Sequence, residues 1–553
     1  MLKYLKQLVL KIPYLGHKYA IYRARKSVDW RRLRWARGNA TSTSNPNKRV
    51  LMATSLGDYE MGVLLESTLA VSLGLRGARV DVLLCDKALE ACQMSKIESI
   101  SPPLMASKGP ASRCDACVSF GTGVFDGSGA TLLFYSNYLD VSAREAARRL
   151  ALETPFSEIR GFVYEGVSVG EHAYAGCLRY FARGDLNGEE WGERILRRYL
   201  ESSMLTVFAV SRLLEENEYD VACFHHGIYV PQGLITQVCQ RKRVRVVTWN
   251  PAYRKNTFVF SHGDTYHHTM ISEPTQSWEQ MPWDDVHRQA IQRYLDSRRR
   301  GTEDWIWFHD TPEEQQDKIE METGIDFSKP CIGLFTNVMW DAQLHYRSNA
   351  FSSMLEWVTE SIRYFAGRPE LECIIRIHPA EIRGAIPSRQ PLLEEIVKAF
   401  PELPPNVKVI PPESQISTYA IMDRCNAVLI YNTKTGIEVS SQGIPVVVAG
   451  EAWIRGKGIA LDADDPTSYV EILDRLPFAE PMTDEQQDRA LRYAYHFFFR
   501  RMIPLPFIHH VPGTSRYSAR LADVARLSPG SEPGLDVICD GILQGTPFNF
   551  GTS

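Results

Sequence analysis

The stretch between residues 374 and 450 constrains the fold of this chain most. Residues 374–377 form a β-branched run that stops before Pro379, because proline cannot donate the hydrogen bond that a longer strand needs. Residues 427–449 then follow the pattern of a strand, a polar turn, a helix and a further strand. Short polar turns between such elements are typical of a parallel, doubly wound sheet. We therefore predict an α/β fold whose ligands lie outside the carboxyl ends of the strands.

The polar turn of this stretch predicts a phosphate site. Thr433 and Thr435 lie where a helix begins, and the first turn of a helix offers backbone N–H groups and positive dipole charge to an anion. We expect both threonines to bind phosphate, Arg376 or His378 to balance its charge, and Glu438 to accept ribose hydroxyls. The alternative is a plain Rossmann-like core in which Thr433 only caps the helix and Glu438 is solvated.

A second loop adds cations to the same region. Arg455 and Lys457 stand among the glycines of residues 450–458, in a flexible loop suited to a phosphate or carboxylate. The alternative is an ordinary surface loop.

The first half of the chain repeats the strand–helix–strand pattern at residues 49–86, so it also predicts a doubly wound domain. Asp58 and Glu60 lie in its first strand-to-helix loop and are candidates for a general base or nucleophile. The alternative is that they only favour the helix dipole. His226 follows another strand and precedes a glycine, so we expect its ring to face an interdomain cleft as a third catalytic candidate.

Residues 225–268 are rich in histidine, which favours a polar substrate surface over a metal site because no helical H-x-x-x-H is present. Glu171-His172 interrupts a mostly helical region and is a weaker candidate for the same cleft. Four clustered thiols could hold zinc, but buried thiols of a cytoplasmic protein are the favoured interpretation. These cysteines are Cys85, Cys92, Cys114 and Cys117.

The length and composition limit the class of protein. A chain of 553 residues is too long for one core, and its net charge of −4 gives no sign of nucleic-acid binding. The eleven cysteines are scattered and odd in number, as in a reducing cytoplasmic setting. No apolar run is long enough for a transmembrane helix, and lysines interrupt the N-terminal apolar positions, so no signal peptide is predicted.

We predict five segments along the chain. They are a basic amphipathic segment and linker (1–45), an N-terminal Rossmann-like acceptor domain (46–300), a C-terminal Rossmann-like donor domain (301–480), a helix that crosses back (481–525) and a mobile tail (526–553).

The N-terminal segment has a strong charge bias. Residues 1–37 hold eleven lysines and arginines against the single acid Asp29. Leu5, Leu8 and the next apolar positions share one face of a helix that we expect to end at Pro13, as in helices that lie on anionic lipid. Interleaved tyrosines and tryptophans, including Trp30, would lie at headgroup depth. The alternative is an amphipathic helix packed on the protein itself. We favour a protein that is peripheral to the inner face of the cytoplasmic membrane.

Taken in order, several motifs resemble those of GT-B glycosyltransferases, and more narrowly of the bacterial capsular polysaccharide biosynthesis family that includes the Kdo transferases. The motifs are Trp340-Asp341, residues 376–381, Ser417-Thr418-Tyr419, residues 433–438, Gly443-Ile444-Pro445 and Gly456-Lys457-Gly458. The resemblance implies two Rossmann-like domains that face a cleft, with the donor nucleotide held by the His378-Pro379 strand end and the Thr435/Glu438 helix. The chain departs from the family at Trp453 and Ala460, which leaves the donor sugar open.

We therefore predict a metal-independent glycosyltransferase, without a cofactor, that moves a sugar from a nucleotide-activated donor to a growing surface polysaccharide or glycolipid. A CMP-linked sugar is one candidate for the donor. Arg376, Lys434 and Lys457 would offset the charge of the leaving group. A nucleotide-sugar epimerase, a polyol-phosphate transferase and a non-catalytic polysaccharide assembly protein remain alternatives. The linkage, the anomeric outcome and the oligomeric state are not determined by the sequence.

Overall fold

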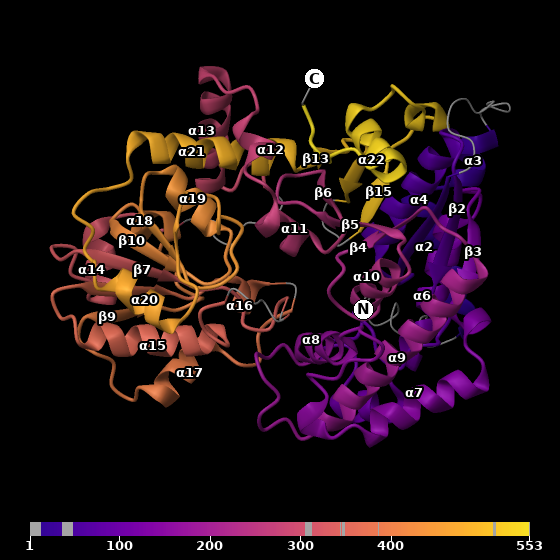
Figure 1. The fold of residues 1–553 in the computed structure, drawn as a ribbon, viewed down its shortest axis with the longest axis horizontal. Coiled ribbons are helices and arrows are strands. Elements are labelled where there is room, and N and C mark those ends of the chain that lie inside the picture. Colours follow the sequence, from indigo (N-terminus) through magenta and orange to yellow (C-terminus); the bar gives the residue numbers. More distant parts are fainter. Residues whose placement is uncertain are drawn as a thin grey trace.

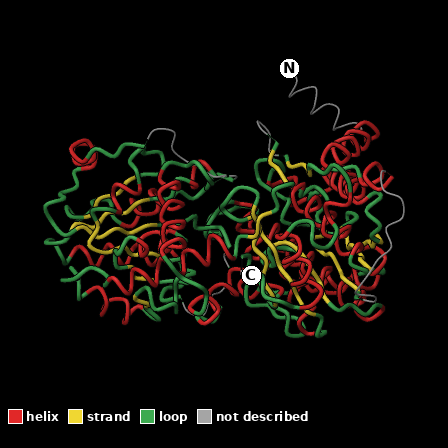
Figure 2. The backbone as a smooth tube through the Cα atoms, turned by 90° about the horizontal axis from the view of Figure 1, so that it is seen from above, coloured by secondary structure: helices red, strands yellow, loops and turns green. Residues whose placement is uncertain are grey.

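The computed structural model describes residues 13–35, 48–304, 312–342, 344, 349–384, 386–511 and 516–551. Two α/β units lie side by side, each built on one sheet with helices on both faces (Figure 1). Figure 2 shows the same two units from above. The α/β fold with two doubly wound units is thus confirmed by the two sheets themselves.

The first sheet has the order β13-β6-β5-β4-β1-β2-β3. Pairs from β3 through β5 are parallel, whereas β6 and β13 join antiparallel at the edge. Its strands are β1 (Arg49–Ser55), β2 (Arg79–Leu84), β3 (Thr131–Phe134), β4 (Val221–His225), β5 (Arg245–Pro251), β6 (Thr257–His262) and β13 (Ile503–Pro504).

The second sheet is parallel throughout, in the order β12-β11-β10-β7-β8-β9. Its strands are β7 (Cys331–Phe335), β8 (Glu372–Arg376), β9 (Val407–Ile410), β10 (Cys425–Ile430), β11 (Val446–Val448) and β12 (Leu461–Asp462). Numbered within each unit, both sheets follow the order 3-2-1-4-5-6 of dinucleotide-binding folds. In each sheet the strand order therefore changes direction between the first and fourth strands, which are β1 and β4 in the first sheet and β7 and β10 in the second. At each of these two switch points a crevice opens at the carboxyl ends of the strands.

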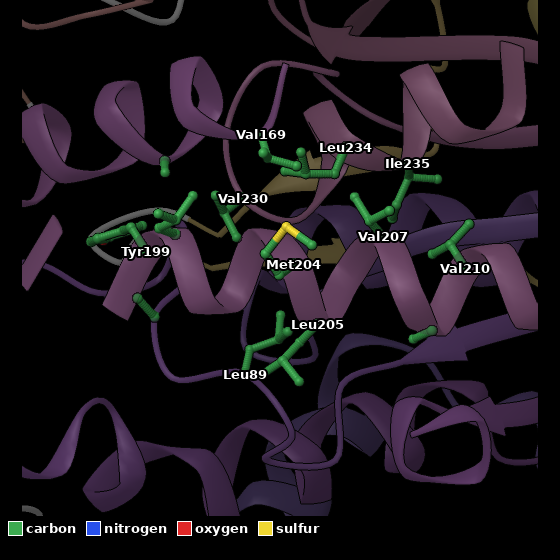
Figure 3. Close-up of a cluster of buried hydrophobic side chains, with 14 of the residues drawn as sticks. Leu89, Val169, Tyr199, Met204, Leu205, Val207, Val210, Val230, Leu234 and Ile235 are labelled. Atoms are coloured by element: carbon green, nitrogen blue, oxygen red, sulfur yellow. The ribbon is translucent and has the colours of Figure 1, made fainter. Parts of the chain in front are cut away.

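The helices of the first unit pack in two layers because its strands are apolar on both faces, as parallel strands are when helices cover both sides. They are α2 (Pro13–Ser27), α3 (Trp30–Trp35), α4 (Glu60–Leu75), α5 (Pro102–Lys108), α6 (Ala111–Phe125), α7 (Val141–Glu153), α8 (Val169–Phe181), α9 (Gly192–Glu216), α10 (Gln232–Arg241) and α11 (Tyr266–Ser272). The longest, α9, buries Met204, Leu205 and Val207 against Leu89, Leu234 and their neighbours (Figure 3).

The connection and the second unit add shorter helices on both faces of the second sheet. They are α12 (Gln276–Glu279), α13 (Asp285–Arg299), α14 (Gln316–Thr323), α15 (Met354–Ala366), α16 (Ala380–Arg383), α17 (Leu392–Ala399), α18 (Thr418–Met422), α19 (Thr435–Ser441) and α20 (Pro466–Leu473). The chain then returns through α21 (Asp484–Tyr495) and the π-helical turn His496–Arg500 to β13, which pairs with β6 of the first sheet.

The N-terminal expectation needs correction where the structure describes it. Pro13 is the first residue of α2, which suits proline because the first helical N–H has no partner within the helix. Helix α2 packs on α6 and buries Ala20 and Ala24, and Trp30 is fully buried and so does not lie at headgroup depth. Residues 1–12, with the predicted lipid-facing positions, lie outside the described residues.

The expected mobile tail is also wrong. Residues 533–544 form helix α22, whose side chains Leu535, Ile538 and Ile542 are fully buried against the first unit. Arg76, directly after α4, forms an ion pair with Asp536 of α22. Glycine, proline and serine before the helix suggested disorder, but the apolar spacing beyond them is helical and supplies a buried face.

This packing predicts that α22 stabilises the first unit. Replacing Ile538 with alanine removes a fully buried side chain and should destabilise the fold by about 2–5 kcal/mol. Gln544→Ala, at the exposed end of the same helix, is the matched control and should change stability little. Urea unfolding followed by circular dichroism measures both, and an unchanged midpoint for Ile538→Ala would contradict the packing.

Candidate functional site

A cavity of about 440 Å³ lies between the two units, within the size range of ligand sites in proteins. Its walls come from the carboxyl ends of both sheets. The first unit contributes His226 after β4 and Asn250 at the end of β5, and the second contributes Thr336 after β7 and Thr433 after β10. The two switch points therefore face one space, and Figure 1 shows α11 and α16 in the gap between the units.

The threonine turn lines this cavity as the sequence predicted. The Thr433 and Thr435 hydroxyl oxygens lie 3.1 Å apart, and the Thr435 N–H donates to the Thr433 hydroxyl at 3.4 Å. Asn432 completes the turn and accepts a hydrogen bond from the Asn337 side chain across the switch point at 3.4 Å. The second unit thus presents hydroxyls and amides at the point where α19 begins.

Glu438 also lines the cavity, but it is neither the open ribose acceptor that we predicted nor the solvated side chain of the alternative. Its carboxylate is buried and lies 3.1 Å from the Arg298 guanidinium and 2.8 Å from the Lys434 ammonium. The Tyr419 hydroxyl donates to its second oxygen at 2.6 Å. Burial alone would raise the pKa of Glu438, but Arg298 and Lys434 bring it well below its usual value. The carboxylate therefore remains ionised and uses most of its acceptor sites inside the protein.

Asp304 joins this charge cluster through a short ion pair with Arg298 and accepts from the Tyr294 hydroxyl at 2.7 Å. Burial lowers the pKa of Lys434, and Arg298 lowers it further, while Glu438 opposes both effects. The Lys434 ammonium also lies 4.8 Å from the centre of the Tyr253 ring. The cluster carries as many cations as carboxylates, which is how buried charges are tolerated.

Arg376 lines the cavity but serves a different purpose from the one predicted. It is buried, and its guanidinium donates to the backbone carbonyls of Pro411 at 2.6 Å and Ser414 at 3.3 Å, and to the Thr418 hydroxyl at 3.3 Å. Burial lowers its pKa to about 10, so it stays cationic at neutral pH. Arg376 thus shapes the wall before α18 and adds positive charge to it.

Lys457 does not reach the cavity. It is buried, and its ammonium donates to the carbonyls of Ile271 at 2.8 Å and Glu273 at 2.6 Å, where burial lowers its pKa to about 8. The glycine-rich loop therefore fastens the second unit to the end of α11. The predicted donor contact of Lys457 is corrected to an anchor between the two units.

His378 lines the cavity from the end of β8. Its Nδ1 accepts a hydrogen bond from the Ala380 N–H at 3.0 Å, so a neutral ring carries its proton on Nε2. The predicted place of His378 at a strand end beside the threonine turn therefore agrees with the geometry.

His226 faces the threonine turn from the first unit. Its φ of 66° lies in the left-handed region, a costly conformation for a residue other than glycine that is often found at functional sites. Its Nδ1 is buried without a hydrogen-bond partner among the described residues. Burial, with His225 and His267 nearby, brings the pKa of His226 well below its usual value. The ring is therefore a neutral imidazole in the cavity wall.

Asp58 and Glu60, in contrast, lie outside the cavity. Arg23 of α2 forms ion pairs with both acids, and Arg113 lies 3.3 Å from Asp58. Helix α6 covers the same loop so closely that a Cβ on Gly57 would lie 2.1 Å from a backbone oxygen. Their predicted catalytic role is therefore corrected to helix-dipole and ion-pair contacts, because α2 and α6 cover the loop after β1.

Several cavity residues had no local signal in the sequence. Arg298 and Tyr253 lie far along the chain from Glu438, so only the fold brings them together. Asp341 belongs to the Trp340-Asp341 motif, and the sequence assigned it no role. Its carboxylate accepts a hydrogen bond from the Tyr229 hydroxyl at 2.7 Å, and this contact joins the two units. The Tyr229 ring centre in turn lies 5.4 Å from that of His226.

Among the residues that the structure describes, no group of three or more histidine, cysteine or acidic side chains could hold a metal ion. Burial raises the pKa of the clustered thiols Cys85 and Cys114 to about 12, so these groups are protonated at neutral pH.

No protein-family model and no curated protein matches this sequence. Similar solved structures include two Thermosulfurimonas dismutans KpsC proteins. The β-Kdo 2,4 transferase has 10% identity and a TM-score of 0.34, with coverage of 56% of this chain and 87% of that chain. The β-Kdo 2,7 transferase has 14% identity and a TM-score of 0.32, with coverage of 56% and 85%. A UDP-GlcNAc 2-epimerase from Neisseria meningitidis has 10% identity and a TM-score of 0.25, with coverage of 81% and 95%. Because these identities and TM-scores are low, the fold assignment rests on the strand orders of the two sheets.

The charge cluster predicts a pH-dependent loss of stability in Glu438→Gln. The substitution leaves Arg298 and Lys434 without their shared carboxylate and should cost about 3 kcal/mol at pH 7. The folded-state pKa of Glu438 is lowered, so its contribution is present above the ordinary value of 4.5 and is lost as the pH falls below it.

The difference between wild type and Glu438→Gln in chemical denaturation should therefore narrow below pH 4.5. Glu480→Gln, an exposed acid of the second unit, is the control. A difference that stays constant with pH would contradict the ionised, buried carboxylate.

Proposed function

We propose that this protein is a glycosyltransferase that moves a sugar from a nucleotide-activated donor to a growing surface polysaccharide or glycolipid. One observation carries the proposal. A single cavity between two switch points joins the hydroxyl-rich turn at Thr433 and Thr435 to the neutral imidazole of His226 on the facing unit.

The second unit would hold the donor phosphate. Thr433 and Thr435 offer hydroxyl donors, and the Arg376 guanidinium adds positive charge to the same wall. This cation suits a leaving group whose charge grows as the bond between sugar and phosphate breaks, since fixed charges stabilise a transition state best where charge develops. The charge of Lys434 is offset by its ion pair with Glu438.

His226 would act as the general base. A neutral imidazole can take the proton from an acceptor hydroxyl while the hydroxyl oxygen attacks the anomeric carbon of the donor sugar. The new bond joins acceptor oxygen to sugar, the old sugar–phosphate bond breaks, and its electron pair leaves with the nucleotide. Tyr229 would help to fix the ring of His226, because its hydroxyl is held by Asp341.

The donor site predicts a nucleotide-dependent gain in stability. A ligand at a hundred times its Kd stabilises the folded state by about 2.7 kcal/mol, so thermal shift with CMP-, UDP-, GDP- and CDP-sugars should raise the Tm for one of them. Thr435→Val removes one hydroxyl at nearly constant volume and should weaken this shift, whereas Thr359→Val, on α15 outside the cavity, should not. The absence of any shift with all four donors would contradict the proposal.

The proposed role of His226 as a general base predicts that its replacement slows the chemical step and leaves nucleotide binding intact. His226→Asn should lower kcat by about 10²–10⁴-fold while the nucleotide shift is kept, because the side chain acts on the acceptor proton. The lowered pKa of His226 also places the acid limb of kcat/KM below pH 6.5. His287→Asn and Asp58→Asn are controls outside the cavity. Full activity of His226→Asn would refute its role.

The alternatives differ in their products. An epimerase would convert the donor sugar without an acceptor, and a polyol-phosphate transferase would favour a CDP-linked donor. A non-catalytic assembly protein would keep its function in the His226→Asn variant. Product analysis in the kinetic assay therefore separates all three from glycosyl transfer.

The basic N-terminus supports a further part of the proposal, attachment to the inner face of the membrane. No helix in the described ranges is long and apolar enough to cross a bilayer. Deleting residues 1–12 removes three lysines and the apolar face, so binding to anionic vesicles in a flotation assay should fall by at least about tenfold. Unchanged flotation would contradict membrane attachment through this segment.

A further inference from the structure

A second polar cavity of about 240 Å³ lies in the first unit beside the cleft. Its walls come from the start of α8, the outer side of α10, the start of α11 and the loop after β4. The lining includes Ser168, Glu171, Gly227, Gln240, Asp264 and His268. The volume is below the range of about 300–1,000 Å³ that is usual for whole drug-sized ligands, so it suits one sugar ring rather than a nucleotide.

The second cavity adjoins the cleft along a shared wall. Three separate segments each place one residue in the cleft and the next residue, or the next but one, in the second cavity. The pairs are His226 and Gly227, His267 and His268, and Ala342 and Leu344. Because three independent segments divide in this way, the two spaces lie on opposite sides of one thin wall that contains His226.

Gly227 makes this wall thin. Its φ of 74° disfavours any side chain, and a Cβ there would lie 3.1 Å from both Thr236 and Thr248. His172 fixes the wall from behind, since its Nδ1 donates to the Ile228 carbonyl and its Nε2 accepts from Gln237 at 3.0 Å. Only one residue, Gly227, thus separates a ligand in the second cavity from the imidazole of His226.

The lining favours hydroxyl groups. Asp264 accepts from the Thr265 N–H at 2.6 Å and lies 2.9 Å from His268, which raises the pKa of His268 against the opposing effect of burial. Glu171 adds a second, half-buried carboxylate. Carboxylates only accept hydrogen bonds, so they recognise hydroxyl donors. Arg241 lines the same cavity and His268 pairs with Asp264, so a ligand that is itself an anion would lose its hydration without a net attraction in return.

We propose that the second cavity binds a ring of the acceptor glycan on the far side of this wall from the reacting hydroxyl, and that this ring is neutral and rich in hydroxyls. Glu171 and Asp264 accept from its hydroxyls, and the wall at Gly227 sets its distance from His226. The inference rests on the proposed glycosyl transfer and adds to it the chemical class and the place of the acceptor.

Saturation-transfer NMR on the full chain tests this inference with simple glycosides. The neutral probes are methyl β-glucoside, methyl β-galactoside and methyl α-mannoside, and the anionic probe is methyl β-glucuronide, which differs from the glucoside only at C6. We expect saturation of at least one neutral glycoside and less of the glucuronide. Glu171→Ala should weaken neutral binding by about tenfold, the size expected for a hydrogen bond to a charged group.

Gln240→Trp is a second variant that fills the mouth of the cavity from an exposed position on α10 and leaves both carboxylates in place. It should also weaken glycoside binding. Glu158→Ala, an exposed acid of the same unit that lines neither cavity, is the matched control and should bind as wild type.

A separate sample with CMP, UDP, GDP and CDP reports on the cleft. Nucleotide binding without any glycoside signal, or glycoside signals unchanged in both Glu171→Ala and Gln240→Trp, would overturn the acceptor site alone. A stronger signal from the glucuronide than from the glucoside would overturn the preference for a neutral ring. Absence of all nucleotide signals would instead count against the proposed donor site.

Discussion

The structure depends on one constraint, which is that the parallel strands of two sheets with the same core strand order direct their carboxyl ends into a common space. In a parallel sheet the loops after neighbouring strands meet at one edge, and the reversal of order leaves a crevice there. At β7/β10 this crevice remains open and contributes Thr336 and Thr433 to the cleft. At β1/β4 the loop after β1 is covered by α2 and α6, so only the loop after β4 faces the cleft, through His226. The two units therefore contribute different chemistry.

The buried charges keep the second wall of the cleft in place. Arg298 belongs to the connection between the units, whereas Glu438 and Lys434 belong to α19 and the turn before it. Their contacts join the connection to the threonine turn and the start of α19. On the opposite side, Tyr229 and Asp341 join the two units, and Arg389 lies 2.8 Å from Glu189. The cleft is thus bounded by polar contacts at two separated places.

The sequence was most informative where the signal is local. Strands at 374–377 and 427–431, and the hydroxyl turn between β10 and α19, follow from β-branched runs and turn residues, and the structure has them in those places. The paired strand–helix–strand patterns were enough to predict two doubly wound units. His226 was placed correctly in the cleft because a strand end before a glycine is itself a local feature.

The errors arose where distant segments meet. In the sequence, Asp58 and Glu60 have the position of catalytic acids, but in the structure Arg23 of α2 forms ion pairs with both. Nothing near residue 60 in the sequence indicates that partner. Glu438 was predicted to accept ribose hydroxyls, and the sequence near residue 438 does not indicate that Arg298 of the connection pairs with it. Helix α22 was missed for the opposite reason, because the glycines and prolines around it outweighed a helical apolar pattern that was present in the sequence.

The central claim is that one ligand bridges the two switch points. Hydrogen–deuterium exchange with and without the best-binding nucleotide sugar tests it most directly. Slower exchange in both residues 432–438 and residues 226–229 is the result expected of a ligand held between Thr433 and His226. Slower exchange that is confined to other segments, with both of these unchanged, would contradict the account.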